Sequence, residues 1–130
     1  MASIFTKIIN GEIPSYKIAE NDKFLAFLDV FPLVYGHVLV IPKKETNYIF
    51  DIEDAELAEM IVFAKKVAKA IKLAVPCKRI GMSVIGLEVP HAHIHLVPMN
   101  TADDVNFTRP KLKPEPEQLS EMAEKIKSKL

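Results

Sequence analysis

The chain contains a five-residue run in which histidine alternates with apolar residues, and this run constrains the local fold more than any other feature. It reads His91-Ala92-His93-Ile94-His95, and further apolar residues follow it directly. Alternation of this kind is typical of a β-strand, because successive side chains of a strand point to opposite faces of the sheet. We therefore predict a strand with three imidazoles on one face and an apolar row on the other. A purely structural sheet gains nothing obvious from such a row, so the run indicates chemistry or metal binding.

Length and charge limit the classes of function. The 130 residues match a single domain over positions 1–130, and 49 % of them are hydrophobic, which can supply a core. The 17 basic and 17 acidic side chains give zero formal charge, which disfavours broad electrostatic capture of nucleic acid or of an anionic membrane. We therefore expect neither nucleic acid nor a membrane as a partner. A small ligand that carries phosphate is still compatible with zero formal charge, because its binding needs only a few local hydrogen-bond donors.

Cysteine content and the first residues favour a reducing compartment. Cys77 is the single cysteine, so no disulfide can form within the chain. The first residues lack the apolar core of a secretion signal, and no apolar run reaches the length of a membrane span. We therefore expect a cytoplasmic protein.

Hydrophobic periodicity divides the chain into short strands and helices. Strands are predicted over 16–20, 23–29, 37–41, 79–85 and the histidine run, helices over 4–9, 53–73 and 114–130, and a loop over 101–113. Ser3 is placed to cap the first helix. Short links between the strands favour an α+β fold with a mostly antiparallel sheet and the helices on one face. The last helix is a C-terminal extension whose thin apolar stripe, ending at Leu130, can pack on its own sheet or on a partner subunit.

Three explanations of the histidines compete at this point. Burial as ordinary core is disfavoured, because each imidazole nitrogen would need its own buried partner. A metal site is the second, since strand histidines can bind one ion and His37, the fourth histidine of the chain, can complete a three-ligand site. Against it, the motif holds no carboxylate to orient a ligand. The third is nucleophilic catalysis, in which a neutral imidazole attacks phosphorus near pH 7.

Nucleophilic catalysis would divide the work among the three histidines of the run. One ring must keep a nitrogen free to attack while its other nitrogen donates to a fixed acceptor. Flanking histidines can donate hydrogen bonds to phosphoryl oxygens, where negative charge gathers in the transition state. The central residue, His93, has a histidine on each side and is the predicted nucleophile.

Four segments resemble the histidine triad family in their order and spacing. The run at 91–97 matches the family signature His-φ-His-φ-His-φ-φ, where φ is an apolar residue. Residues 4–15, 25–29 and 36–43 resemble the segments that this family carries before its triad. The chain is identified as a member of this family over about residues 3–99.

The resemblance implies a fold and an activity. Members are homodimers in which two five-stranded antiparallel sheets join into one continuous ten-stranded sheet. They bind purine nucleotides and cleave nucleotidyl conjugates, such as phosphoramidates or dinucleoside polyphosphates. Their middle histidine is transiently nucleotidylated, and no cofactor is implied.

The resemblance also implies roles for individual residues. His93 would carry the nucleotide, His95 and His37 would lie by the α-phosphate, and the carbonyl group of His91 would orient the His93 ring. Asp29 matches the carboxylate that accepts from the ribose hydroxyls, and a carboxylate can take two such donors. The residues that match the base pocket are Ile4, Phe5, Ile8, Ile13, Phe27 and Val30.

The chain departs from the family near the leaving group. Ile85 stands where many members have Asn, and Glu88 replaces a hydroxyl residue that assists the leaving group. Glu88 can act as a general acid for a departing amine, or it can simply face solvent. The backbone amide of Val89 can still meet the phosphate, whereas Pro90 has no N–H to give.

A second departure concerns zinc. Many bacterial members carry a Cys-x-x-Cys pair near the N-terminus and a histidine after the third strand. Ser3, Thr6 and Glu45 stand at those positions here, so we expect no metal.

The expected function is hydrolysis of nucleoside 5′-phosphoramidates or related AMP-type conjugates through a covalent intermediate on His93. A purine nucleotide-binding or adaptor protein with little turnover is the alternative, because of Ile85 and Glu88. A metal-dependent hydrolase is the third possibility.

Overall fold

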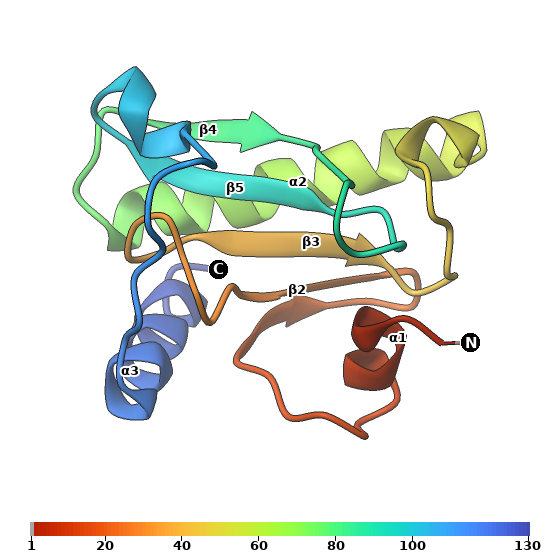
Figure 1. Ribbon diagram of the computed structural model, residues 1–130, viewed down its shortest axis with the longest axis horizontal. Coiled ribbons are helices and arrows are strands. Elements are labelled where there is room, and N and C mark those ends of the chain that lie inside the picture. Colours follow the sequence, from red (N-terminus) through yellow and green to blue (C-terminus); the bar gives the residue numbers. More distant parts are fainter. Residues whose placement is uncertain (1) are drawn as a thin grey trace.

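The strands form one five-stranded sheet, seen face-on in Figure 1. The computed structural model describes residues 2–130. Its elements are α1 (Ile4–Ile9), β1 (Lys17–Glu20), β2 (Phe24–Leu28), β3 (Val38–Pro42), the 3₁₀ turn η1 (Ile49–Asp51), α2 (Asp54–Ala74), β4 (Arg79–Ser83), β5 (Ile94–Met99), the 3₁₀ turn η2 (Ala102–Val105) and α3 (Pro116–Lys127). The strand order is β1-β2-β3-β5-β4, and every neighbouring pair is antiparallel. The predicted α+β class with a five-stranded antiparallel sheet is confirmed.

The first two predicted strands form a hairpin. The Asn21 side chain closes its turn, because Oδ1 accepts from the backbone N–H groups of Lys23 at 2.9 Å and Phe24 at 2.8 Å. Both β2 and β3 are buried at every position, which explains their unbroken apolar sequences.

The sheet is covered on both faces, which corrects the prediction that the helices share one face. Phe24, Ala26 and Leu28 of β2 point into the larger core, where α2 and α3 pack. The alternate residues Leu25 and Phe27 point the other way and pack against α1. Figure 1 shows α1 in front of the sheet and α2 behind it. The short α1 buries only two side chains, so its sequence could not reveal which face it covers.

The C-terminal helix packs on its own sheet rather than requiring a partner subunit. Leu119, Ala123 and Ile126 of α3 are buried in the same core as the inward side chains of α2. Leu130 lies beyond the end of α3 and is 48 % exposed, so the predicted apolar stripe ends earlier than expected.

The histidine run is only partly a strand. β5 begins at Ile94, and the preceding residues form other hydrogen bonds: the N–H of His91 donates to the carbonyl of Val89, and the N–H of Ala92 donates to the carbonyl of Thr46. The predicted alternation still holds, because Ala92, Ile94 and Leu96 all enter the core opposite the histidines.

Smaller boundary differences occur elsewhere. β4 ends at Ser83 instead of position 85, and the predicted loop over 101–113 contains η2, which Thr101 and Asp104 stabilise as a capping box. Across residues 2–130, none of the helices combines the length and the apolar character needed to cross a bilayer.

Candidate active site

The pairing of β3 with β5 brings His37 and His95 together. Leu39 of β3 lies opposite His95 of β5, and His37 sits just before β3 begins. As a result, His37 Nε2 lies 2.9 Å from His95 Nδ1, although the two residues are 58 positions apart. Both rings are buried, His37 to 1 % exposure and His95 to 8 %.

A hydrogen-bond chain fixes the protonation of these two rings. The backbone N–H of Leu33 donates to His37 Nδ1 at 3.1 Å, so the hydrogen of the neutral His37 ring lies on Nε2. That hydrogen is donated to His95 Nδ1, and the hydrogen of neutral His95 therefore lies on Nε2. Burial, followed by the charges of neighbouring groups, lowers the pKa of His37 to about 3 and the pKa of His95 to about 4. Both rings are therefore neutral at pH 7, with the Nε2–H of His95 available as a donor.

His93 has the opposite tautomer. Its Nδ1 lies 2.7 Å from the carbonyl oxygen of His91, and a carbonyl can only accept, so Nδ1 carries the hydrogen. The lone pair of the neutral ring is therefore on Nε2. The ring of Phe5 meets His93 edge to face at a centroid distance of 5.0 Å, which limits rotation of the imidazole. His93 is the predicted nucleophile, and this tautomer is the one that nucleophilic attack through Nε2 requires.

Asp29 lies next to the histidines, directly after β2. Its backbone N–H donates to the carbonyl of His37 at 3.0 Å, and its Oδ1 accepts from the backbone N–H of Phe31 at 2.9 Å. Burial raises the pKa of the Asp29 carboxyl, which the hydrogen bond from Phe31 partly opposes. The second oxygen, Oδ2, is 3.8 Å from His37 Nε2, too far for a hydrogen bond.

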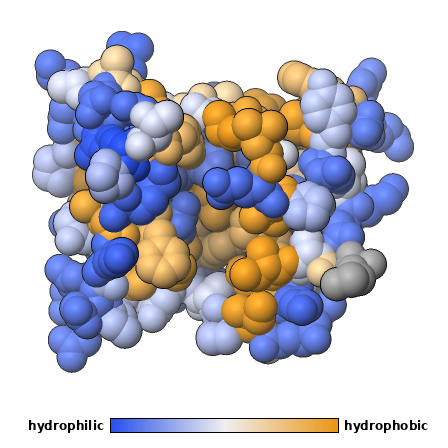
Figure 2. Space-filling view, in the orientation of Figure 1, coloured by the Kyte–Doolittle hydropathy of each residue, from blue (hydrophilic) through white to orange (hydrophobic). Residues whose placement is uncertain are grey.

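An apolar cluster lies beside His93, on the face that α1 covers. Among the residues predicted for the base pocket, Phe5, Ile8 and Phe27 belong to its buried core, and Ile13 packs against it together with Val89. The rings of Phe5 and Phe27 meet at 5.6 Å. Ile4 and Val30 are not part of this cluster; they are 50 % and 42 % exposed. Figure 2 shows apolar side chains gathered over α1, beside a hollow in the same face of the molecule.

The segment before the triad places Glu88 in solvent. Glu88 is exposed, and its carboxylate makes no hydrogen bond or ion pair to any of residues 2–130. Ile85, at the position where many histidine triad proteins have Asn, is 47 % exposed. Glu88 therefore faces solvent, and its role as a general acid stays a prediction.

Two residues next to the histidines were missed by sequence reasoning. Phe107, from the segment after η2, packs edge to face on His95 at 4.7 Å and on His37 at 6.2 Å. Lys111 Nζ donates to the carbonyl of Phe107 at 2.6 Å, and its charge helps to lower the pKa values of both histidines. A single phenylalanine in an aperiodic polar stretch gives no signal that it covers a site.

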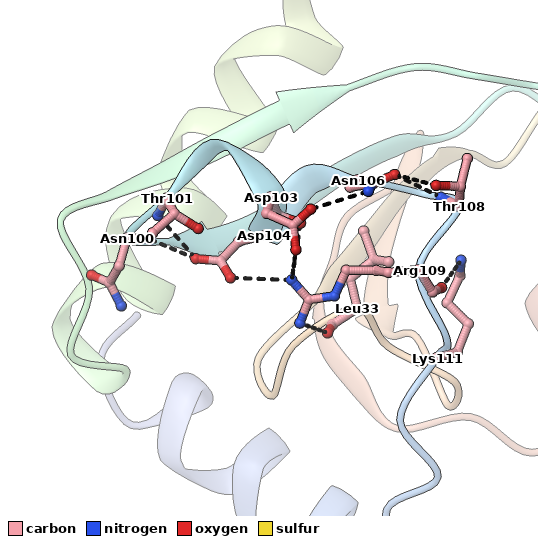
Figure 3. Close-up of polar contacts among 9 residues, drawn as sticks. All are labelled: Leu33, Asn100, Thr101, Asp103, Asp104, Asn106, Thr108, Arg109 and Lys111. Atoms are coloured by element: carbon pink, nitrogen blue, oxygen red, sulfur yellow. Dashed lines mark hydrogen bonds and ion pairs between the residues drawn. The ribbon is translucent and has the colours of Figure 1, made fainter.

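Arg109 fixes the position of this segment. As Figure 3 shows, its guanidinium reaches Asp103 and Asp104 of η2 and also donates to the carbonyl of Leu33, the residue whose N–H bonds to His37. The N–H of Leu112 also donates to the carbonyl of Pro32. The segment after β5 is therefore tied to the loop that leads into His37.

Asp29, His37 and His95 are also the residues that could hold a metal. Each offers one ligand atom, and these atoms lie within 4.8 Å of one another. However, the 2.9 Å between His37 Nε2 and His95 Nδ1 is shorter than the roughly 3.3 Å that two nitrogens keep around tetrahedral zinc at bond lengths of about 2.0 Å. The geometry fits a shared hydrogen better than a shared metal ion.

Comparison with known proteins supports one family. Residues 10–102 match the HIT domain. A Borreliella burgdorferi protein named as an uncharacterized HIT-like protein is 37 % identical over an alignment of 131 positions, which covers 95 % of this chain and 94 % of that protein. The adenosine 5′-monophosphoramidase hnt1 of Schizosaccharomyces pombe is 35 % identical over an alignment of 136 positions, which covers 100 % of this chain and 99 % of that protein.

The fold is similar to that of solved structures. The crystal structure of a Hit-like protein from Bartonella henselae, titled as involved in cell-cycle regulation, superimposes with a TM-score of 0.85 at 33 % identity. The match covers 98 % of this chain and 96 % of that chain. A hypothetical histidine triad nucleotide-binding protein from Sulfolobus tokodaii gives a TM-score of 0.82 at 30 % identity, covering 96 % and 89 % of the two chains. Together with the matched domain, these relatives establish that the chain belongs to the histidine triad (HIT) family.

Proposed function

We propose that the protein hydrolyses nucleoside 5′-phosphoramidates or related AMP-type conjugates through a nucleotide bound covalently to His93. The observation that carries this proposal is the His93 tautomer, in which Nδ1–H donates to the His91 carbonyl and Nε2 keeps its lone pair. Relatives from Saccharomyces cerevisiae and Schizosaccharomyces pombe that are named adenosine 5′-monophosphoramidase support the same class of substrate.

The first chemical step forms the bond between His93 Nε2 and the α-phosphorus. The bond from phosphorus to the amine nitrogen breaks, and the amine leaves with a proton that we assign to water, because Glu88 faces solvent. During this step the Nδ1–H bond to the His91 carbonyl stabilises the positive charge that develops on the ring. Water then attacks phosphorus, the bond to Nε2 breaks, and the nucleoside monophosphate is released.

His95 and His37 together stabilise the negative charge of the phosphoryl group. The Nε2–H of His95 donates to a phosphoryl oxygen, and His37 holds this tautomer through the bond to His95 Nδ1. Burial lowers the pKa values of both rings to about 3 and about 4, so both are neutral donors at pH 7 before the substrate binds.

The nucleoside would lie between α1 and the end of β2. The base would pack on the exposed side of the cluster that contains Phe5, Ile8 and Phe27, with Ile4 and Val30 at its solvent edge. Among residues 2–130 no backbone N–H donates to Asp29 Oδ2, so this oxygen can accept from a ribose hydroxyl. We propose that purine nucleotides bind here.

We further propose a homodimer in which positions 1–130 form one domain of each subunit. β4 is an edge strand, and an edge strand can pair with another copy of itself. Apolar side chains are exposed next to this edge, with Met82 at 57 % and Ile61 of α2, which lines the same pocket, at 40 %. Pairing through β4 would produce the continuous ten-stranded sheet.

The test is hydrolysis of AMP joined to an amine by a P–N bond, with no metal added. We expect turnover by the natural protein and none by His93→Ala, while both bind AMP. Ser128→Ala is the matched control, because this exposed hydroxyl donates to the Lys125 carbonyl at the end of α3. Binding of AMP without turnover at high protein concentration would support the second candidate function, a nucleotide-binding or adaptor protein. The exposed Ile85 and the unpartnered carboxylate of Glu88 favour that candidate.

A further inference from the structure

Four residues from distant parts of the sequence meet at the start of α1 and form a polar cluster, which we call the N-terminal clasp (Ser3, Thr6, Glu45 and His91). Ser3 Oγ lies 2.7 Å from His91 Nδ1, and the backbone N–H of Ser3 donates to Glu45 Oε1 at 2.7 Å. The Thr6 hydroxyl donates to the same carboxylate oxygen at 2.6 Å. The clasp therefore joins α1, the segment after β3 and the first histidine of the triad.

The direction of each hydrogen bond in the clasp follows from the number of hydrogens. The Thr6 hydroxyl has one hydrogen, which goes to Glu45; this bond and the Ser3 N–H lower the pKa of the Glu45 carboxyl to about 2. His91 Nε2 lies 2.8 Å from the carbonyl oxygen of Pro42 and must carry a hydrogen, so Nδ1 of the neutral ring is an acceptor. The Ser3 hydroxyl therefore gives its single hydrogen to His91 and accepts from the Thr6 N–H at 3.0 Å.

The clasp matters because the sheet does not hold His91. β5 begins only at Ile94, and the N–H of His91 bonds locally to Val89. The buried His91 ring is instead held between two partners, the Ser3 hydroxyl and the Pro42 carbonyl. The backbone carbonyl of the same residue accepts from His93 Nδ1–H at 2.7 Å. A change in the backbone angles of His91 would move this carbonyl, which keeps the hydrogen of His93 on Nδ1.

We propose that Ser3, Thr6 and Glu45 are positioning residues that hold His91 and, through its carbonyl group, keep the lone pair of His93 on Nε2. This inference rests on the proposed function in one respect, namely that His93 is the nucleophile. Ser3 acts directly on the His91 ring. Thr6 and Glu45 act on Ser3, since Thr6 donates its N–H to the Ser3 hydroxyl and Glu45 accepts from the Ser3 backbone.

The experiment compares variants that remove or keep each hydroxyl. Ser3→Ala should lower kcat on the order of tenfold with KM within about twofold, the scale found when an outer partner of a functional histidine is removed. Ser3→Thr, which keeps the hydroxyl, should restore most of the activity. Thr6→Val should give a smaller loss in the same direction, and Thr6→Ser should not. Ser128→Ala again serves as the control, because its hydroxyl lies at the end of α3 and outside the clasp.

A second measurement follows the tautomers without any turnover. The ¹⁵N chemical shifts of the imidazole nitrogens should place the hydrogen on Nδ1 of His93 and on Nε2 of His91 in the natural protein. In Ser3→Ala, the hydrogen of His93 should be shared between its two nitrogens. If Ser3→Ala does not fold, the same comparison is made between Thr6→Val and Thr6→Ser.

Two results would overturn the inference. One is a folded Ser3→Ala protein with unchanged kcat and unchanged His93 shifts. The other is a loss of kcat that Ser3→Thr fails to restore or that Ser128→Ala reproduces. Absence of turnover in the natural protein, together with the expected tautomers and their change in Ser3→Ala, would contradict the proposed function while supporting the clasp.

Discussion

Replacement of His37 by Leu tests how a buried residue acts on the phosphoryl group. His37 is only 1 % exposed and connects the backbone N–H of Leu33 to His95 Nδ1. Leu has nearly the right volume but no nitrogen, so His95 loses the donor that keeps its own hydrogen on Nε2. With the hydrogen on Nδ1 instead, the lone pair of Nε2 would face the phosphoryl oxygens and repel them.

The expected loss of kcat equals the loss that follows when one hydrogen-bond donor to the negatively charged transition state is removed. Removing such a donor lowers kcat about 10²- to 10³-fold, or about 3 to 4 kcal/mol. The buried Leu33 N–H also loses its acceptor, which costs about 1 to 3 kcal/mol of folding stability. His37→Gln is the matched control, because its amide nitrogen can donate to His95 from a similar position.

The assay is steady-state hydrolysis of an amine-linked AMP, with the folded fraction measured by circular dichroism at the same temperature. We expect kcat to fall at least about 100-fold in His37→Leu and much less in His37→Gln, with KM changing little in either. A folded His37→Leu protein whose kcat stays within threefold of the natural value would refute the role assigned to His37.

Three further predictions concern pH, metal and assembly. In the folded protein the pKa values of His37 and His95 are lowered to about 3 and about 4, whereas in the unfolded chain both rings bind a proton below about pH 6.5. The free energy of unfolding should therefore stay constant above that pH and fall as the pH drops toward about 4. Urea unfolding at pH 7.5 and pH 5 should differ by about 2 kcal/mol for each histidine, and equal stabilities would contradict the lowered values. EDTA should leave the rate of hydrolysis unchanged; a loss that zinc restores would mean that Asp29, His37 and His95 hold a metal. Met82→Asp, at the exposed edge strand, should convert a dimer into monomers in sedimentation velocity, and a variant that remains dimeric would exclude β4 as the interface.

Much of the fold could be predicted from local patterns. The three- and four-residue spacing of buried residues such as Met60, Ala64, Val67 and Ile71 defined the long helix to within a residue at each end. Ser3 was correctly predicted as the cap of α1, since the N–H of Thr6 donates to its hydroxyl.

The remaining features depend on contacts that no local pattern encodes. Residues 91–93 alternate as a strand would, yet Ala92 bonds to Thr46, which is distant in the sequence. The position of α1 on the second face depends on two buried side chains in a single short helix. Phe107 reaches the histidines only because Arg109 and Leu112 tie its segment to Leu33 and Pro32.

Part of the candidate site could likewise be predicted from the sequence, and part of it could not. The proximity of His37 to the triad and the bond from His93 to the His91 carbonyl follow the family pattern in the sequence. The link from Ser3 to His91 does not, because it spans 88 positions, and the sequence predicted Ser3 only as a helix cap and as the replacement of a zinc ligand.

The most direct test of the whole account is the chemical identity of the intermediate. Protein mixed with an amine-linked AMP and quenched within milliseconds should carry one added AMP, and fragmentation should place it on Nε2 of His93. The adduct should be absent from His93→Ala and should survive longer in variants that slow its hydrolysis. Turnover with no adduct on any histidine, or an adduct on His91 or His95, would contradict the central claim that His93 is the nucleophile.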